Sequence, residues 1–189
     1  MKILSNVWKN KNLLKILKEG KIAVAPTDTI YGILGRAENG TTVEKIYELR
    51  RRSPQKPCII LIGKENELAL FEIKLSDKQK SNLKKYWPGA VSIILDCSKN
   101  SFSYLHRGTK TLAFRMPASK ELRNLLMATG PLIAPSANTE GKPPAKNIKE
   151  AEKYFGDSVD LYVDGGEIQG NASKVVRLYN DGSVSIIRR

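Results

Sequence analysis

The chain of 189 residues is poor in the side chains that many enzymes use for nucleophilic or metal chemistry. It contains one histidine, His106, and two cysteines, Cys58 and Cys97, which form no CxxC pair. A Ser/His or Cys/His pair would depend on His106, but its setting SYLHRGTK has no such motif, so we expect a loop or surface residue. We expect the cysteines to be small residues of buried strands, without a disulfide, metal or catalytic role.

Long apolar runs are also missing. No stretch approaches the roughly 20 apolar residues of a membrane-spanning helix. Lysines interrupt the short apolar run of the amino terminus, MKILSNVWKNKNLLKIL, so we expect no signal peptide there. We therefore expect a cytoplasmic protein with no membrane association.

Glycine motifs for phosphate binding and the HExxH zinc motif are absent as well. There is no GxxxxGK[ST] loop, and GILGRAENG does not follow a strand with GxGxxG spacing. A bound nucleotide would therefore be held by side chains from several loops.

Positive charge is what the chain has in excess. It contains 32 Lys and Arg against 19 Asp and Glu, a net charge of +13. Phosphates and polyanions suit such a chain as partners. The lysines of KNKNLLKILKEGK and KLSDKQKSNLKK, however, have the pattern of polar helix faces, and we interpret them as solvated surface.

The length and the apolar pattern predict one domain over residues 1–189. Helices are expected around residues 13–17 (ended by Gly20), 41–49, 76–86, 121–128 and 147–155, with capping boxes at Thr41/Glu44 and Ser76/Gln79 and an Asn147 cap. Strands are expected at 21–25, 58–62, 90–95, 111–116 and 131–134, with a hairpin over 175–187. Crossover and hairpin connections together predict an α+β, or mixed α/β, sheet protein.

Two strand-to-loop junctions carry dense sets of small polar side chains, KIAVAPTDTIYG and PLIAPSANTEGKPP. Thr27, Asp28 and Thr29 offer short donors and acceptors, and Ser136 and Asn138 can point the same way in an extended segment. Such residues also satisfy turns and helix caps. Two of these loops after strands favour a site for a small polar ligand.

Several arginines lie where an anion would explain them. Arg115 interrupts the apolar strand TLAFRMP and must reach solvent or an anion, so it is a candidate for binding carboxylate or phosphate. In RRRSPQKP, Arg50 and Arg52 could place two guanidinium groups over one phosphate, and Pro54 and Pro57 would stiffen the segment. Interaction with the carbonyl end of the preceding helix is the alternative for these arginines.

Six blocks in this order, PTDTIYG, RRRSPQKP, WPGAVSIIL, LAFRMP, APSANTEG and GNASKVV, resemble the YrdC family of threonylcarbamoyl-AMP synthases. The resemblance implies a twisted, mostly open mixed β-sheet flanked by helices, with a basic concave surface and without the second domain of longer relatives. It implies a nucleotidyltransferase that makes L-threonylcarbamoyladenylate and pyrophosphate from L-threonine, bicarbonate and ATP, with Mg²⁺ on the phosphates. Partner proteins would use the product to modify the adenosine next to the anticodon in tRNA, and contact with tRNA or double-stranded RNA is a further expectation.

The resemblance also assigns roles by motif position. Threonine would be bound by Thr29, Arg115 and Ser173. Charge on the phosphates would be stabilised by Arg50, Arg52 and Lys56, with no acid or base residue. ATP would be bound by Arg50, Arg52, Lys56, Thr111, Ser136, Asn138 and Arg188, and the protein would supply no metal ligand.

Four residues depart from the family pattern. Arg50 replaces a lysine, Ser92 and Lys174 replace threonines, and Glu140 replaces a serine. Two alternatives to the synthase follow from the charge and from the departures. The chain could be an RNA-binding module without enzymatic activity, or a paralogue that forms a carbamoyl adenylate from carbamoyl phosphate.

Overall fold

The computed structural model describes residues 7–53 and 55–189, so the stiffening role expected for Pro54 lies outside the described residues. Its strands are β1 Ala23–Pro26, β2 Tyr31–Arg36, β3 Ile59–Leu61, β4 Val91–Asp96, β5 Thr111–Arg115, β6 Leu132–Ile133, β7 Leu161–Tyr162, β8 Lys174–Leu178 and β9 Val184–Arg188. Its α-helices are α2 Lys11–Lys18, α3 Gly40–Leu49, α4 Asp77–Leu83, α5 Ser103–His106, α6 Lys120–Thr129 and α7 Ile148–Phe155. Short 3₁₀ helices are η1 Glu65–Phe71, η2 Asn100–Phe102 and η3 Gly156–Ser158.

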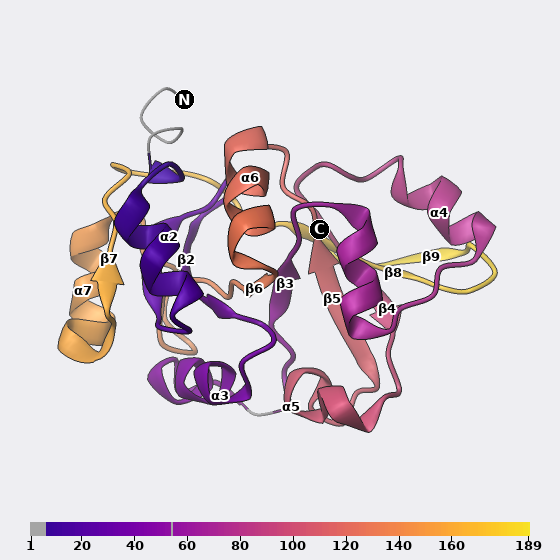
Figure 1. The fold of residues 1–189 in the computed structure, drawn as a ribbon, viewed down its shortest axis with the longest axis horizontal. Helices are drawn as coiled ribbons and strands as arrows, with labels where there is room; N and C mark the ends of the chain where they lie inside the picture. The colour runs from indigo at the N-terminus through magenta and orange to yellow at the C-terminus, as the bar shows by residue number, and fades with distance from the viewer. Residues whose placement is uncertain (1–6, 54) are drawn as a thin grey trace.

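The strands form one open sheet in the order β7-β1-β2-β6-β3-β5-β4-β8-β9. Three neighbouring pairs are parallel, β1 with β7, β3 with β5 and β4 with β8, and the other pairs are antiparallel. Figure 1 shows α7 and β7 at one end of the molecule and the β8–β9 hairpin at the other. The predicted mixed α/β class, with an open sheet flanked by helices, is therefore confirmed.

The core lies on both faces of the sheet because successive strand residues point in opposite directions. Val24 belongs to one hydrophobic cluster and its neighbour Ala23 to the other. Ile46 of α3 packs into the first cluster, whereas Leu17 of α2 and Leu126 of α6 pack into the second. Helices thus cover both faces, and polar side chains at the strand ends remain available for a site.

Most predicted helix signals are confirmed. Gly20 follows α2 with a φ of 74°, and the Ser76/Gln79 capping box has both of its hydrogen bonds. The capping box at Thr41 and Glu44 was wrong. Asn39 caps α3 instead, by accepting a hydrogen bond from the amide of Thr42, because the helix begins at Gly40.

Strand β2 was not predicted from the sequence. Its two glycines, Gly32 and Gly35, weaken the usual strand signal, since glycine is depleted in strands. A Cβ on Gly35 would overlap Thr42 and Ile46, so this glycine lets α3 pack closely on the sheet. The hairpin of β1 and β2 places the TDT turn at the edge of the site described below.

The expectation for His106 was wrong. Its side chain is buried at the end of α5, and its Nδ1 accepts a hydrogen bond from the amide of Gly108 at 3.1 Å. Cys58 and Cys97 are buried, as expected, but they lie one position outside the strands, before β3 and after β4. SYLHRGTK forms the short helix α5 and a tight turn, so the imidazole of His106 contacts the backbone of this turn.

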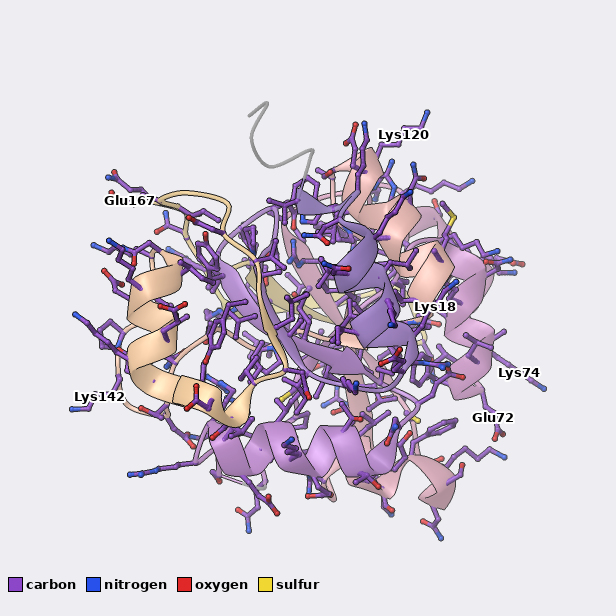
Figure 2. The ribbon with its side chains drawn as sticks, turned by 60° about the vertical axis from the view of Figure 1, so that its left-hand side comes forward. Lys18, Glu72, Lys74, Lys120, Lys142 and Glu167 are labelled. Carbon is purple, nitrogen blue, oxygen red and sulfur yellow. The ribbon has the colours of Figure 1, made fainter. Side chains whose placement is uncertain are left out.

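The surface lysines point into solvent. Lys18, Lys74, Lys120 and Lys142 are exposed, and Figure 2 shows the last three directed away from the body of the protein. This confirms that the lysines of the two polar segments, to which Lys18 and Lys74 belong, form a solvated surface. Among residues 7–53 and 55–189, every helix is too short or too polar to cross a membrane.

Candidate functional site

A cavity of about 340 Å³ lies on one face of the sheet. Its walls come from the turn of residues 27–29 after β1 (the TDT turn), the RRRSPQKP segment after α3, and the loop of residues 134–147 after β6, which contains Ser136, Ala137 and Asn138 (the SAN loop). Strands β5, β8 and β9 complete them. Eight of the ten predicted site residues line it, namely Thr29, Arg50, Arg52, Thr111, Arg115, Ser136, Ser173 and Arg188. The volume is in the range of small-molecule sites, which is roughly 300–1,000 Å³.

The charge of the lining has one sign. Arg50, Arg52, Arg115 and Arg188 contribute to the wall, and no Asp or Glu is found among the described residues that line it. Converging guanidinium groups in a concave, partly desolvated site favour an anion. The cavity is therefore suited to phosphate and carboxylate groups.

Arg50 is buried and joins two walls of the cavity. Its Nε donates to the carbonyls of Ser136 at 2.8 Å and Asn138 at 3.1 Å, and its Nη2 donates to Ser136 Oγ and Asn138 Oδ1, both at 3.1 Å. Burial lowers the pKa of Arg50 to about 10, so the side chain stays charged at neutral pH. Its guanidinium group is largely occupied by the SAN loop.

The end of α3 explains how Arg50 and Arg52 both reach the cavity. Arg51 has a φ of 48°, and the amide of Arg52 donates back to the carbonyl of Tyr47 at 3.0 Å. This is a left-handed helix terminus, in which glycine is usual. The side chain of Arg51 is exposed and outside the cavity lining.

Arg52 is held by its own segment. Its Nε donates to the carbonyl of Lys56 at 2.9 Å and its Nη2 to that of Pro57 at 3.1 Å. The hydroxyl of Tyr47, from α3, donates to the same Lys56 carbonyl at 2.9 Å. The guanidinium group of Arg52 is thus held at the cavity wall by carbonyl groups of its own segment.

Lys56 and Asn138 lie outside the cavity lining. The Lys56 ammonium is 2.5 Å from Glu140 Oε1, and its side chain is 62% exposed. Hydrogen bonding from Lys56, and from the amide of Ser53, lowers the pKa of Glu140. The side-chain Nδ2 of Asn138 donates to the carbonyls of Thr139 and Lys142, so Asn138 supports the loop. Direct ATP contacts by both residues remain a prediction.

Arg115, at the end of β5, stands beside the TDT turn. Its Nη1 lies 2.5 Å from Asp28 Oδ1, and its Nη2 donates to Thr29 Oγ1 at 3.3 Å. Asp28 also accepts from the amide of Ala118, which fixes the carboxylate. Thr27 Oγ1 lies 3.0 Å from Thr29 Oγ1. The buried ion pair orients one cationic side chain toward a wall of small hydroxyl groups.

The opposite wall is formed by the carboxy-terminal strands. Ser173 Oγ lies 2.8 Å from the buried Ser92 Oγ, and the Ser173 carbonyl accepts from Arg188 Nε at 3.2 Å and Nη2 at 2.7 Å. Burial, together with the positive charge of Arg52, lowers the pKa of Arg188. Thr111 Oγ1 donates to Thr109 Oγ1 at 3.2 Å.

Sequence reasoning missed the apolar part of the lining. This part includes Pro57, Ile59, Ile94, Ala113, Ala134 and Val175. Strand alternation alone assigns such residues to a face but does not tell which face is hollowed. Cys58 also lines the cavity, and burial raises the pKa of its thiol, so it is a neutral wall residue.

A family model for the Sua5, YciO and YrdC proteins, described as "Telomere recombination", matches residues 15–189. The chain is 32% identical over 174 residues to the threonylcarbamoyl-AMP synthase of Pyrococcus abyssi, covering 90% of this chain and 51% of that protein. It is 30% identical over 175 residues to that of Idiomarina loihiensis, covering 91% and 92%. The chain spans about half the length of the Pyrococcus abyssi and Bacillus subtilis relatives.

Solved structures show the same fold. The crystal structure of Pyrococcus abyssi Sua5 complexed with L-threonine matches with a TM-score of 0.85 and 28% identity, over 96% of this chain and 54% of that one. Escherichia coli YciO matches with a TM-score of 0.82 and 22% identity, over 98% and 89%.

Proposed function

Because the chain belongs to the Sua5, YciO and YrdC family, we propose that it is a threonylcarbamoyl-AMP synthase. The reaction takes L-threonine, bicarbonate and ATP to L-threonylcarbamoyladenylate and pyrophosphate. One observation carries the proposal: four arginines and no carboxylate face one cavity, within the described part of its wall. The relatives named threonylcarbamoyl-AMP synthase and the Sua5 complex with L-threonine support it.

The two substrates would occupy different walls. Arg115, with Thr29 and Ser173 across the cavity, would bind the carboxylate and hydroxyl groups of threonine. Arg52 and Arg188 would bind the phosphates, with Thr111 and Ser136 toward the nucleoside. Arg50 would act mainly by holding the SAN loop in place.

In this reaction the protein aligns the reactants and supplies positive charge. The threonine nitrogen bonds to the carbon of CO₂ and loses a proton, which gives the carbamate. With bicarbonate the same N–C bond forms while a C–O bond of the bicarbonate breaks, and the departing hydroxide leaves as water with the proton from nitrogen. A carbamate oxygen then bonds to the α-phosphorus, while the bond from that phosphorus to the bridging oxygen breaks and pyrophosphate leaves. The guanidinium groups hold the reactants in line and offset the negative charge that shifts to the leaving group.

We propose that Mg²⁺ enters with ATP on its phosphate oxygens. Between residues 7 and 189, Pro54 aside, no cluster of three or more His, Cys, Asp or Glu could hold a metal ion. The donor set of the cavity therefore does not fit a metal held by protein ligands. Mg²⁺ commonly keeps several waters and binds to substrate phosphates, which is consistent with this lining.

The proposed product is an activated group, so partner proteins would transfer it to the adenosine next to the anticodon in tRNA. We propose that the reaction takes place in the cytoplasm. The net charge of +13 would assist an encounter with tRNA.

The test is pyrophosphate release by the purified protein with ATP and Mg²⁺. We expect release to require both L-threonine and bicarbonate, with an adenylate of the expected mass in the product. Release that is indifferent to either one would refute the synthase. Activity with carbamoyl phosphate in their place would support the carbamoyl-adenylate paralogue. RNA binding with a steep salt dependence but without any adenylate would support the RNA-binding module.

A further inference from the structure

Glu140 links two segments that form different walls of the cavity. It lies in the SAN loop, after β6, and faces the stretch of residues 50–57, which we call the arginine segment. The described residues of this stretch include no strand and no helix beyond the end of α3. Its shape therefore depends on contacts with its surroundings.

Three contacts join Glu140 to the arginine segment. The amide of Glu140 donates to the carbonyl of Arg50 at 2.8 Å. One carboxylate oxygen accepts from the amide of Ser53, and the other lies 2.5 Å from Lys56 Nζ. Start, middle and end of the segment are thus attached to one residue.

Arg52 lies between these attachment points. Its guanidinium group donates to the carbonyls of Lys56 and Pro57, so its position follows the shape of the backbone around it. A shift of the segment would move Arg52 along the cavity wall. Displacements of about 1 Å are enough to cost on the order of a hundredfold in rate when reactants must be aligned.

We propose that Glu140 is a positioning residue that holds Arg52 in place at the phosphate wall, and that Lys56 serves to neutralise Glu140. This inference rests on the proposed adenylate-forming function. A carboxylate beside a polyanion site would repel the phosphates if it were unpaired. The Lys56–Glu140 pair lets the protein use a carboxylate as an anchor without presenting its charge to ATP.

These roles predict different effects for variants of Glu140 and of Lys56. Glu140→Ala removes the acceptor of the Ser53 amide, whereas Glu140→Gln keeps a side-chain oxygen there. Lys56→Met leaves the carboxylate unpaired. In the double variant Lys56→Met/Glu140→Gln the unpaired charge is gone, so ATP binding should improve over Lys56→Met alone.

The experiment measures kcat and the KM for ATP by pyrophosphate release, ATP affinity by calorimetry, and hydrogen exchange of the arginine segment, all in the full chain. Glu19→Gln is the matched control, because Glu19 forms a similar exposed pair with Lys21 at 3.0 Å and does not line the cavity. Glu140→Ala should lower kcat/KM for ATP between about tenfold and a hundredfold and speed exchange in the segment. Glu140→Gln should recover most of that loss.

Two results would overturn the inference. One is a Glu140→Ala protein that matches the Glu19→Gln control in kcat/KM and in exchange. The other is a double variant that binds ATP no better than Lys56→Met, which would make Lys56 a direct phosphate ligand. If the wild-type protein releases no threonine-dependent pyrophosphate, the proposed function fails, and ATP affinity with exchange still decides the role of Glu140.

Discussion

Arg50 and Asn138, 88 residues apart in the chain, are joined by two hydrogen bonds of 3.1 Å, from Arg50 Nε to the Asn138 carbonyl and from Nη2 to Oδ1. The same guanidinium group also binds Ser136. Arg50 was predicted to contact phosphate, and it does line the cavity. Its hydrogen bonds show that it connects the arginine segment to the SAN loop.

Replacing Arg50 should therefore affect stability as well as activity. Arg50→Met leaves acceptors of the half-buried Ser136 and the buried Asn138 without a donor, and should reduce the free energy of unfolding by about 2–3 kcal/mol. Arg50→Lys should recover part of this loss, because one ammonium reaches fewer of the acceptors. Urea unfolding at pH 7 measures both. Arg51→Met, at an exposed site, is the control, and equal stability of the two methionine variants would contradict this role.

Arg52 should matter for chemistry and little for folding. Arg52→Ala removes a fixed cation from the cavity wall and should lower adenylate formation by about a hundredfold or more. Arg51→Ala changes the neighbouring arginine, which does not line the cavity, and should leave the rate unchanged. Pyrophosphate release compares the two variants, with thermal unfolding as a check on the fold. Equal rates would remove Arg52 from the proposed site.

Replacing Arg115 should affect the binding of L-threonine more than the binding of ATP. Arg115→Lys keeps a charge but cannot reach both Asp28 and Thr29 with a planar fork, so the KM for L-threonine should rise by about tenfold or more, and the KM for ATP should change less. Substrate titrations separate the two effects. The matched control is Arg177→Lys, since Arg177 pairs with Asp96 on an exposed surface. A rise confined to the KM for ATP would reverse the assignment of the walls.

Gly170 lies against the backbone of Thr29, in the part of the cavity wall that we propose binds L-threonine. A Cβ at this position would overlap the carbonyl oxygen of Thr29, so Gly170→Ala must displace one of the two backbones. We expect a higher KM for L-threonine, by roughly tenfold. Gly40→Ala is the control, because a Cβ there would lie 3.7 Å from the Tyr104 ring, an ordinary contact. Unchanged threonine kinetics in Gly170→Ala would show that the displacement does not reach Thr29.

Glu140 should also make stability depend on pH. Lys56 and the Ser53 amide lower the pKa of its carboxylate in the folded protein. The wild-type protein should therefore be more stable than Glu140→Gln above the ordinary glutamate pKa of about 4.3. The advantage should disappear as pH falls through the lowered folded-state pKa, where the carboxylate is protonated. Urea unfolding at pH 7 and at lower pH measures the difference, and a gap that widens on acidification would contradict the sign.

Much of the fold could be read locally. The Ser76/Gln79 box and the Asn147 cap act over a few positions, and they are present as predicted. Errors arose where local signals competed. Asn39 took the cap expected two residues later, and His106 was buried by a turn whose contacts depend on its neighbours.

The candidate site divides in the same way. Eight of the ten residues predicted from the motifs line one cavity, but only Thr29 and Ser136 do so from loops that follow strands. The other six come from the end of α3 or from residues in or beside β5, β8 and β9. The contacts that each residue makes within the site could not be predicted from the sequence. Lys56 was expected to face phosphate, yet its ammonium is paired with a carboxylate 84 residues away.

The sequence by itself determined the charge, the mixed helix and strand pattern, and the polar junctions where a ligand would be bound. These depend on residue type and on spacing over a few positions. Only the tertiary structure decided which cations face the cavity and which are used to join its walls, as in Arg50 with Asn138 and Lys56 with Glu140. The reason is physical: a charge acts on whatever lies within a few ångströms of it, and the path of the chain alone sets those neighbours.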